Sequence, residues 1–151
     1  MAEESAVYFP RWPEEIFQKL ERTLRKWNYS DVQIDRRLGV MREHFPESTV
    51  TGYEGMANSF AVHEKDRHVL ACAIRAGAHV LVTDNRKDFP NRTMDKLGIE
   101  CLCGVEFLQR QYLLSPERFI RILDNQRIDT GMSMAELFAR LPAGLEDLIR
   151  F

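Results

Sequence analysis

The sequence is poor in cysteine: three of its 151 residues are cysteines, an odd number. This usage argues against a framework of disulfide bonds and is typical of a protein from a reducing compartment. The sequence also lacks an apolar run long enough to cross a membrane. Its first residues, Met1-Ala2-Glu3-Glu4, are unlike a signal peptide. These absences predict a cytoplasmic protein without a membrane partner.

An excess of charge of one sign is also missing. Lysine and arginine together number 21, aspartate and glutamate 23, and the formal net charge is -2. A strongly basic composition would indicate nucleic acid directly, whereas a near-neutral chain can still bind it where basic residues gather locally. No glycine-rich phosphate loop occurs, which argues against an α/β phosphatase or nucleotide-binding domain. The length is that of one domain.

The N-terminal third carries the signals of two helices. Trp12-Pro13-Glu14-Glu15 opens the first, because proline suits the first helical position and acidic residues suit the positive helix N-terminus. Ser30 can cap a second helix over residues 31–44. Apolar residues at helical spacing are expected to be buried: Ile16, Leu20, Leu24 and Trp27 in the first helix, and Val32, Ile34, Leu38 and Met41 in the second.

Short apolar runs alternate with helical patterns in the middle of the chain. Residues 49–51 predict a strand, and a well-buried helix is expected from Asp66 or Arg67 to Ala76, where Gly77 ends it. Val80-Leu81-Val82 is continuously apolar, as in an inner strand of a parallel sheet. A helix over 93–97, a strand over 99–103 and a helix over 105–112 follow. This order predicts an α/β fold with parallel crossovers.

The last third of the chain has the pattern of helices only. Ser115-Pro116-Glu117 is a strong helix start, and Ser133 with Glu136 forms a capping box that opens a further helix. A final short helix is expected up to Phe151. The chain therefore divides into an α/β domain over residues 1–113 and a helical extension over residues 114–151.

Acidic residues mark both ends of the central helix and strand. Asp66 begins the helix, and Asp84, Asn85 and Asp88 follow the strand. Such positions meet at the edge of a parallel sheet where ligands bind. Carboxylate and amide oxygens gathered there suit Mg²⁺ or Mn²⁺, which support phosphodiester cleavage. The spacing alone fits structural roles equally well, with Asp66 as a helix cap and Asp84-Asn85 as a turn.

Other polar residues near these acids carry weaker signals. Arg86 and Lys87 can meet a phosphate backbone, although a solvated loop is the better interpretation of the pair by itself. His68 lies one turn inside the buried helix, where a histidine is more often a core or rim residue than a ligand. Cys72 is expected to be a small helix-packing residue.

The stretch from Asp66 to Pro90 resembles the signature of PIN-domain ribonucleases of the VapC toxin type. The shared pattern is an acidic residue, Arg-His-Val-Leu-Ala, a Gly-Ala turn, Val-Thr, an Asn and Asp-Phe-Pro. The likeness extends upstream through Val50-Thr51-Gly52-Tyr53-Glu54 to Arg11-Trp12. Downstream, Leu114-Ser115-Pro116, Asp124-Asn125-Gln126-Arg127 and the helix after Ser133 are similar to the C-terminal helical extension of one VapC subgroup.

The resemblance implies a Rossmann-like, three-layer α/β/α PIN-like fold with a short parallel sheet. It also implies a Mg²⁺- or Mn²⁺-dependent endoribonuclease that acts as a toxin and is held in check by a cognate antitoxin. Asp66, Asn85 and Asp88 match the catalytic positions, and Asp66, Asp84 and Asp88 are the metal candidates. Asp84 stands where this subgroup often has an apolar residue. Candidates for RNA contact are Arg67, Arg86 and Lys87.

Two departures from the family pattern stand out. PIN domains begin with a strand that ends in an acid, and this chain begins after it, so residues 1–113 correspond to a truncated domain. Lys19 occupies the place of the second acid, and Glu15, one turn earlier on the same helix face, is the possible substitute acid. A lysine there would compete with a metal cation or pair with Asp66. Metal binding by the isolated chain is accordingly expected to be weak or lost.

Two hypotheses follow for the chain as a whole. In the first, it is a ribonuclease completed by a missing N-terminal segment or by a small complementing chain that supplies the first strand; a homodimer is a further possible partner arrangement. In the second, it is a catalytically inactive PIN-like module that binds a partner protein or RNA. Lys19 favours the second hypothesis, and the retained Asp66, Asn85 and Asp88 favour the first.

Overall fold

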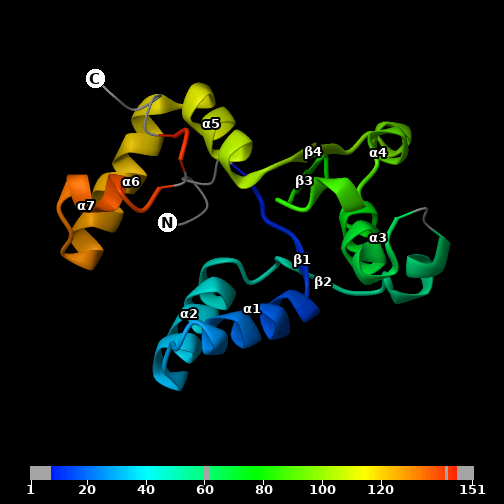
Figure 1. Ribbon diagram of the computed structural model, residues 1–151, viewed down its shortest axis with the longest axis horizontal. Coiled ribbons are helices and arrows are strands. Elements are labelled where there is room, and N and C mark those ends of the chain that lie inside the picture. Colours follow the sequence, from blue (N-terminus) through cyan, green and yellow to red (C-terminus); the bar gives the residue numbers. More distant parts are fainter. Residues whose placement is uncertain (1–7, 60–61, 142, 146–151) are drawn as a thin grey trace. The chain divides into compact units, whose positions relative to one another are not determined.

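The computed structural model describes residues 8–59, 62–141 and 143–145. The chain forms two compact units, whose elements are labelled in Figure 1. Unit 1 comprises Met1–His79 and Asp88–Ile99, and unit 2 comprises Val80–Lys87 and Glu100–Phe151. Each unit has its own clusters of buried apolar side chains.

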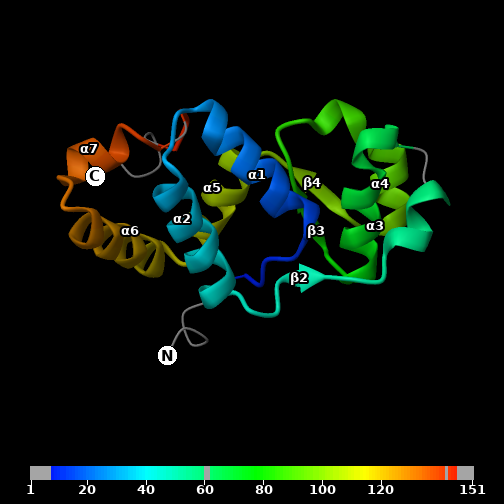
Figure 2. The same ribbon diagram turned by 90° about the horizontal axis from the view of Figure 1, so that it is seen from below.

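Unit 1 contains the helix pair α1 (Glu15–Lys26) and α2 (Asp31–His44), which lie side by side (Figure 2). Phe17 and Leu24 of α1 pack with Ile34 and Leu38 of α2, and all four side chains are buried. Their spacing gives each helix one apolar stripe, and the burial of both stripes holds the pair together. The two helices predicted from the sequence are confirmed.

Two residues predicted to be buried in this pair are exposed. Trp27 is the C-terminal cap of α1 and is 66% exposed, and Val32 in the first turn of α2 is 78% exposed. Both residues lie close to the connection between the helices, beyond the stretch where the two stripes face each other. Helical periodicity by itself does not indicate where that stretch ends, and the prediction for these residues is wrong.

The segment before α1 is a strand. Trp12–Pro13 forms β1, which pairs in parallel with β2 (Thr49–Val50). The prediction that Pro13 is the first helical residue is wrong, because α1 begins at Glu15. Proline has no backbone N–H to donate to a neighbouring strand, so it is accepted in short strands at the edge of a sheet, as in the β1–β2 pair.

Helix α3 (Arg67–Arg75) follows the 3-10 turns η2 (Glu54–Ser59) and η3 (Glu64–Asp66) and packs against β1 and η2. Its Ala71 and Cys72 are buried in a cluster with Tyr53. Gly77 ends the helix region with a φ of 63°, a left-handed conformation that glycine adopts without strain. Unit 1 also includes α4 (Asn91–Leu97), which ends at Gly98.

Unit 2 contains the parallel strands β3 (Val80–Val82) and β4 (Glu100–Leu102), with Leu81 opposite Cys101. Three helices follow, α5 (Gly104–Leu114), α6 (Pro116–Thr130) and α7 (Met134–Phe138). They enclose a core of buried side chains that consists of Tyr112, Leu123, Leu137 and Leu145. The helices predicted after Ser115 and Ser133 are thereby confirmed.

Strand β3 was expected to be an inner strand, but among the described residues β4 is its only neighbour. Leu81 is buried, whereas Val82 is 45% exposed. The prediction of an inner strand is therefore wrong for this part of the chain. A continuous apolar run does not by itself say how many strands flank it.

The fold agrees with the expected class in outline. It is a mixed α/β fold, mostly helical, and its described strands form two separate two-stranded parallel sheets. The three-layer arrangement and the division of the chain after residue 113 stay predictions. The end of the final helix predicted up to Phe151 lies outside the described residues. None of the helices in the described ranges has both the length and the apolar character needed to cross a membrane.

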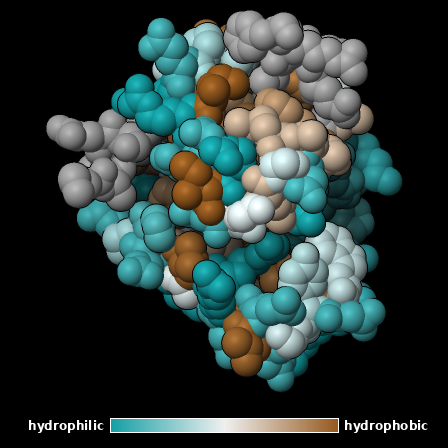
Figure 3. Space-filling model, turned by 90° about the vertical axis from the view of Figure 1, so that its left-hand side faces the viewer, coloured by the Kyte–Doolittle hydropathy of each residue, from teal (hydrophilic) through white to brown (hydrophobic). Residues whose placement is uncertain are grey.

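Exposed apolar side chains occur at several positions, among them Phe9, Leu113, Leu114 and Ile128. On the face shown in Figure 3, apolar side chains (brown) alternate with hydrophilic ones (teal). Such alternation is ordinary for a protein surface. The polar clusters around the predicted acids are more informative about function.

Candidate functional site

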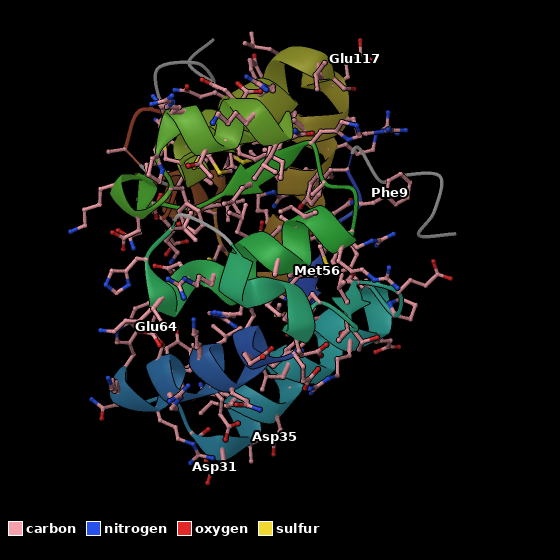
Figure 4. The ribbon with its side chains drawn as sticks, turned by 90° about the vertical axis from the view of Figure 1, so that its right-hand side faces the viewer. Phe9, Asp31, Asp35, Met56, Glu64 and Glu117 are labelled. Atoms are coloured by element: carbon pink, nitrogen blue, oxygen red, sulfur yellow. The ribbon has the colours of Figure 1, made fainter. Side chains whose placement is uncertain are left out.

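The side chains of α1 and α3 meet at a contact between Lys19 and His68. Lys19 Nζ lies 3.0 Å from His68 Nε2. An ammonium group can only donate hydrogen bonds, so His68 Nε2 accepts, and the imidazole ring is neutral with its proton on Nδ1. Lys19 is exposed and His68 is half-buried. Figure 4 labels Glu64, which begins the turn η3 that leads into α3.

The surroundings of His68 favour its neutral form. Burial lowers the pKa of His68, and the nearby charge of Lys19 lowers it further. The carboxylates of Glu15 and Asp66 act in the opposite direction, as does a hydrogen bond with the backbone of Lys65. The imidazole ring thus lies within electrostatic reach of one cation and two carboxylates of unit 1.

Glu15 is held by a buried tyrosine. The Tyr53 hydroxyl donates to Glu15 Oε2 at 2.5 Å, and Tyr53 is 3% exposed. This hydrogen bond lowers the pKa of Glu15, burial acts in the opposite direction, and the nearby charge of Lys19 lowers the pKa further. Burial raises the pKa of Tyr53, and the bond to Glu15 raises it further. Glu15 is therefore a fixed, ionised carboxylate next to Lys19 and His68.

Cys72 lies behind this group on α3. Its thiol is buried, and burial together with the negative charge of Glu15 raises its pKa to about 11. A thiol with so high a pKa stays protonated and unreactive near neutral pH. The prediction that Cys72 is a packing residue is confirmed by its place in the cluster with Tyr53 and Ala71.

Asp66 occupies the N-cap position of α3, but its side chain makes no capping hydrogen bond to the helix. The structural interpretation of Asp66 as a helix cap therefore fails on geometry, since a cap acts through a side-chain oxygen that accepts from the first turn. The Asp66 side chain is half-buried. Of the two alternatives considered for Lys19, the ion pair with Asp66 does not occur in the described part of the chain, where Lys19 contacts His68.

In unit 2, the residues after β3 have local structural roles. Asp84 Oδ1 accepts a hydrogen bond from the Gly104 backbone N–H at 3.2 Å, at the start of α5. The Asn85 backbone N–H donates to Thr83 Oγ1 at 3.2 Å. These bonds agree with the turn interpretation of Asp84 and Asn85. They leave further lone pairs of the Asp84 carboxylate for other partners.

The three basic candidates for RNA contact differ in how they are engaged. Arg86 Nη1 donates to both carboxylate oxygens of Glu106, at 2.9 and 3.0 Å. Arg67 is half-buried, and its Nε donates to the Val62 carbonyl oxygen at 3.4 Å. Lys87 is exposed.

The predicted acids are distributed over both units. Glu15, Asp66 and Asp88 belong to unit 1, and Asp84 and Asn85 belong to unit 2. Within the described ranges, no three His, Cys, Asp or Glu side chains come close enough to hold a metal ion. The residues around His68 supply two carboxylates and one ammonium group, and this donor set does not fit a divalent cation by itself. The convergence of all the predicted acids stays a prediction.

The sequence analysis gave Tyr53 no functional role and predicted His68 to be a core or rim residue. Tyr53 contacts Glu15 across 38 positions of the chain, and His68 contacts Lys19 across 49. Tyr53 lies in a stretch that carries the family likeness, Val50-Thr51-Gly52-Tyr53-Glu54, which was the available signal. No local pattern indicates that His68 accepts a hydrogen bond from Lys19.

The fold and the polar cluster define an α/β protein that places acidic residues at a helix start and after a parallel strand. One curated protein similar to this chain is named "Putative ribonuclease VapC50" and comes from Mycobacterium tuberculosis strain H37Rv. The two are 41% identical over 66 residues, which are 44% of this chain and 39% of that protein. The chain thus matches about two-fifths of the length of this relative. The similarity supports a relationship to the VapC-like, PIN-type proteins.

Other comparisons add no relatives. No protein-family model matches the chain, and no solved structure matches it. The likeness to the subgroup with a C-terminal helical extension stays a prediction.

Proposed function

We propose that this chain is a metal-dependent endoribonuclease of the PIN type, and that it acts as the toxin of a toxin-antitoxin system in the cytoplasm. The observation that carries the proposal is the 41% identity to a protein named as a ribonuclease. The acid at the head of α3, together with Asn85 and Asp88, supports it from the sequence. The failure of Asp66 to cap α3 also supports a role for its carboxylate outside the helix.

The proposal assigns catalytic, metal-binding and RNA-binding roles to the polar residues described above. Asp66, Asn85 and Asp88 are the catalytic residues, and Asp66, Asp84 and Asp88 are the carboxylates that would take Mg²⁺ or Mn²⁺. Glu15, which Tyr53 holds in place, is the substitute for the acid that Lys19 replaces. RNA phosphates are met by Lys87 and Arg67, and by Arg86 when it exchanges Glu106 for a phosphate.

The set of acids in these residues is incomplete relative to the family pattern. We therefore propose that activity requires a further acidic strand supplied by a segment outside the described residues, either in the same polypeptide or in a small complementing chain. Among the described residues β3 pairs with one strand, β4, and this pairing is consistent with the addition of a further strand. A cognate antitoxin and a second copy of the chain are the other proposed partners.

The test is cleavage of a single-stranded RNA by the full chain, with the encoded upstream segment added, in the presence of Mg²⁺ or Mn²⁺. Asp66→Asn keeps the size of the side chain and removes its charge, and is expected to abolish cleavage. The matched control is Asp35→Asn, because Asp35 is an exposed carboxylate on α2 (Figure 4). Control and wild type should cleave at equal rates.

Absence of metal-dependent cleavage by the completed wild-type protein would contradict the proposal. RNA or protein binding without cleavage would then identify the chain as an inactive PIN-like module. Equal rates for wild type and Asp66→Asn would remove Asp66 from the catalytic set.

A further inference from the structure

We infer that the connection between α1 and α2 is an anchoring surface for single-stranded RNA, where aromatic rings stack with bases and cations meet phosphates. The inference goes beyond the proposed catalytic residues and rests on the proposed function only for the choice of RNA as the ligand. Figure 4 labels Asp31, the first residue of α2, which follows this connection. The anchoring surface consists of Arg22, Lys26, Trp27, Tyr29 and Arg37, all of which belong to unit 1.

Two aromatic side chains of the anchoring surface are exposed. Trp27, the C-terminal cap of α1, is 66% exposed, and Tyr29, two residues later, is 37% exposed. An indole or phenol ring presents a large apolar face, and every nucleobase has a π face that can stack on it. The two rings therefore offer a contact that accepts any base of an RNA strand.

The backbone that carries these rings is fixed by the ends of both helices. Asn28 adopts a φ of 60°, and its N–H donates to the Arg25 carbonyl oxygen at 3.0 Å. The Tyr29 N–H donates to the Leu24 carbonyl oxygen at 3.1 Å. These two bonds form the Schellman motif that commonly ends helices. Ser30 then opens α2 with a complete capping box. Because the support is rigid, binding orders little additional backbone.

A guanidinium group is already stacked on one of the rings. Arg37 Cζ lies 5.4 Å from the centroid of the Tyr29 ring, and both residues are exposed. Arginine planes and aromatic rings stack with unpaired bases, and a guanidinium group also donates hydrogen bonds to phosphate oxygens. Tyr29 and Arg37 thus combine a stacking surface and a phosphate donor at one place.

The charge around the rings is positive, in contrast to the chain as a whole. Residues 22–31 contain three arginines and lysines and one aspartate, a net charge of +2, whereas the whole chain has a net charge of -2. Arg22 and Lys26 are exposed and lie one turn apart on α1. Among the described residues, no carboxylate forms an ion pair with either of them. Their charges are available to a phosphate backbone.

Exposed rings next to unpaired cations favour single-stranded RNA over other ligands. In a duplex the bases stack on one another, whereas unpaired bases can turn outward and stack on side chains. An acidic protein segment would meet Arg22 and Lys26 but would supply no stacking partner for Trp27. We therefore expect binding that depends little on base sequence and strongly on salt.

The first test measures binding of a fluorescein-labelled oligouridylate of about 12 nucleotides to the full chain by fluorescence anisotropy. EDTA is present, so that metal-dependent cleavage does not interfere. Trp27→Ala is expected to weaken binding about tenfold, because one base loses its stacking partner. Trp27→Phe keeps an aromatic ring and should stay within about threefold of wild type. Phe9→Ala is the matched control, since Phe9 is an aromatic residue that is 73% exposed and lies outside the anchoring surface (Figure 4).

Tryptophan emission gives a second measurement that a purely structural role of Trp27 would not change. Trp12 and Trp27 are the two tryptophans of the chain. Stacking of a base on the exposed indole quenches its fluorescence, so the oligouridylate should quench wild type. Trp27→Phe retains only Trp12 and should bind the RNA with little quenching.

The cations are tested through the salt dependence of binding. Lys26→Gln combined with Arg22→Gln should reduce the slope of log affinity against log salt concentration by about 1.4, which is about 0.7 for each lost phosphate contact. Lys96→Gln combined with Arg121→Gln is the matched control, because both residues are exposed cations outside the anchoring surface. Its slope should equal that of wild type.

Circular dichroism confirms that each variant is folded. Equal RNA affinities for wild type and Trp27→Ala, or a loss in Phe9→Ala as large as in Trp27→Ala, would overturn the inference and indicate a protein as the ligand of this surface. An unchanged salt slope in the variant without Arg22 and Lys26 would also overturn it.

The outcome separates this inference from the proposed function. Weaker RNA binding by Trp27→Ala with no RNA cleavage by the completed wild-type protein would contradict the ribonuclease and keep the anchoring surface. Metal-dependent cleavage with unchanged RNA affinity in every variant would do the reverse.

Discussion

At the scale of single residues, the most consequential contact is the hydrogen bond from Tyr53 to Glu15. It joins the first turn of α1 to the segment after β2, and it fixes a carboxylate next to a lysine. A hydrogen bond to a charged acceptor contributes more than one between neutral groups. Tyr53 is therefore a positioning residue for Glu15, whatever ligand the cluster takes.

Tyr53→Phe is expected to destabilise the protein by about 1–2 kcal/mol near neutral pH, because Glu15 loses its donor. The pKa of Glu15 is lowered in the folded protein, so the contribution of its charged form is present above the ordinary glutamate pKa of 4.5 and is lost as the pH falls through the lowered value. The difference between wild type and variant should thus shrink as the pH falls below 4.5.

Urea unfolding of wild type and Tyr53→Phe, near neutral pH and again below pH 4.5, measures this difference in the free energy of unfolding. Tyr29→Phe is the control, since Tyr29 lies at the surface beside Arg37 and a phenylalanine ring keeps that cation–π contact. A pH-independent loss of stability in Tyr53→Phe would show that the hydroxyl acts through packing and leaves the charge of Glu15 unaffected.

At the scale of elements, local signals decided most helix ends. Ser133 and Glu136 form the capping box predicted at α7. Ser30 caps α2 as predicted, and Gln33 completes a second capping box there. Such motifs act within four residues of each other and are therefore readable from sequence. The prediction of a helix start at Pro13 was wrong because proline is also compatible with a short strand. The strand that pairs with it, Thr49–Val50, lies 36 or more residues away in the chain and gives no local signal.

Ser30→Ala is expected to cost about 1 kcal/mol of stability, because the Gln33 backbone N–H loses its acceptor. Ser115→Ala is the control: Ser115 holds the N-cap position of α6 without a side-chain hydrogen bond to the helix. That variant should change the free energy of unfolding by less than about 0.5 kcal/mol. Chemical denaturation of both variants measures the difference, and equal losses would contradict the capping role of Ser30.

At the scale of the molecule, the buried side chains form separate clusters in each unit. Leu24 is fully buried in the cluster of α1 and α2, and Leu137 is buried in the cluster of α5, α6 and α7. Because each cluster stabilises mainly the helices that contribute to it, we expect the two units to open in separate steps.

Leu24→Ala is expected to lower the stability of unit 1 by about 2–5 kcal/mol, since the buried side chain leaves a cavity. Hydrogen exchange should then speed up in α1 and α2 and stay unchanged in α6 and α7. Leu137→Ala is the reciprocal variant and should show the opposite distribution. Uniform acceleration of exchange along the chain in either variant would show that the two units unfold as one.

The sequence by itself determined most of the helices, the caps at Ser30 and Ser133, the strands β2, β3 and β4, and the candidate acids Asp66, Asp84, Asn85 and Asp88. These features depend on periodicity and on residues that are near one another in the chain. Only the tertiary structure decided that Lys19 contacts His68 and that Tyr53 holds Glu15. Each pair is separated by more than 35 positions, and the energy of such a contact depends on packing that no local pattern encodes.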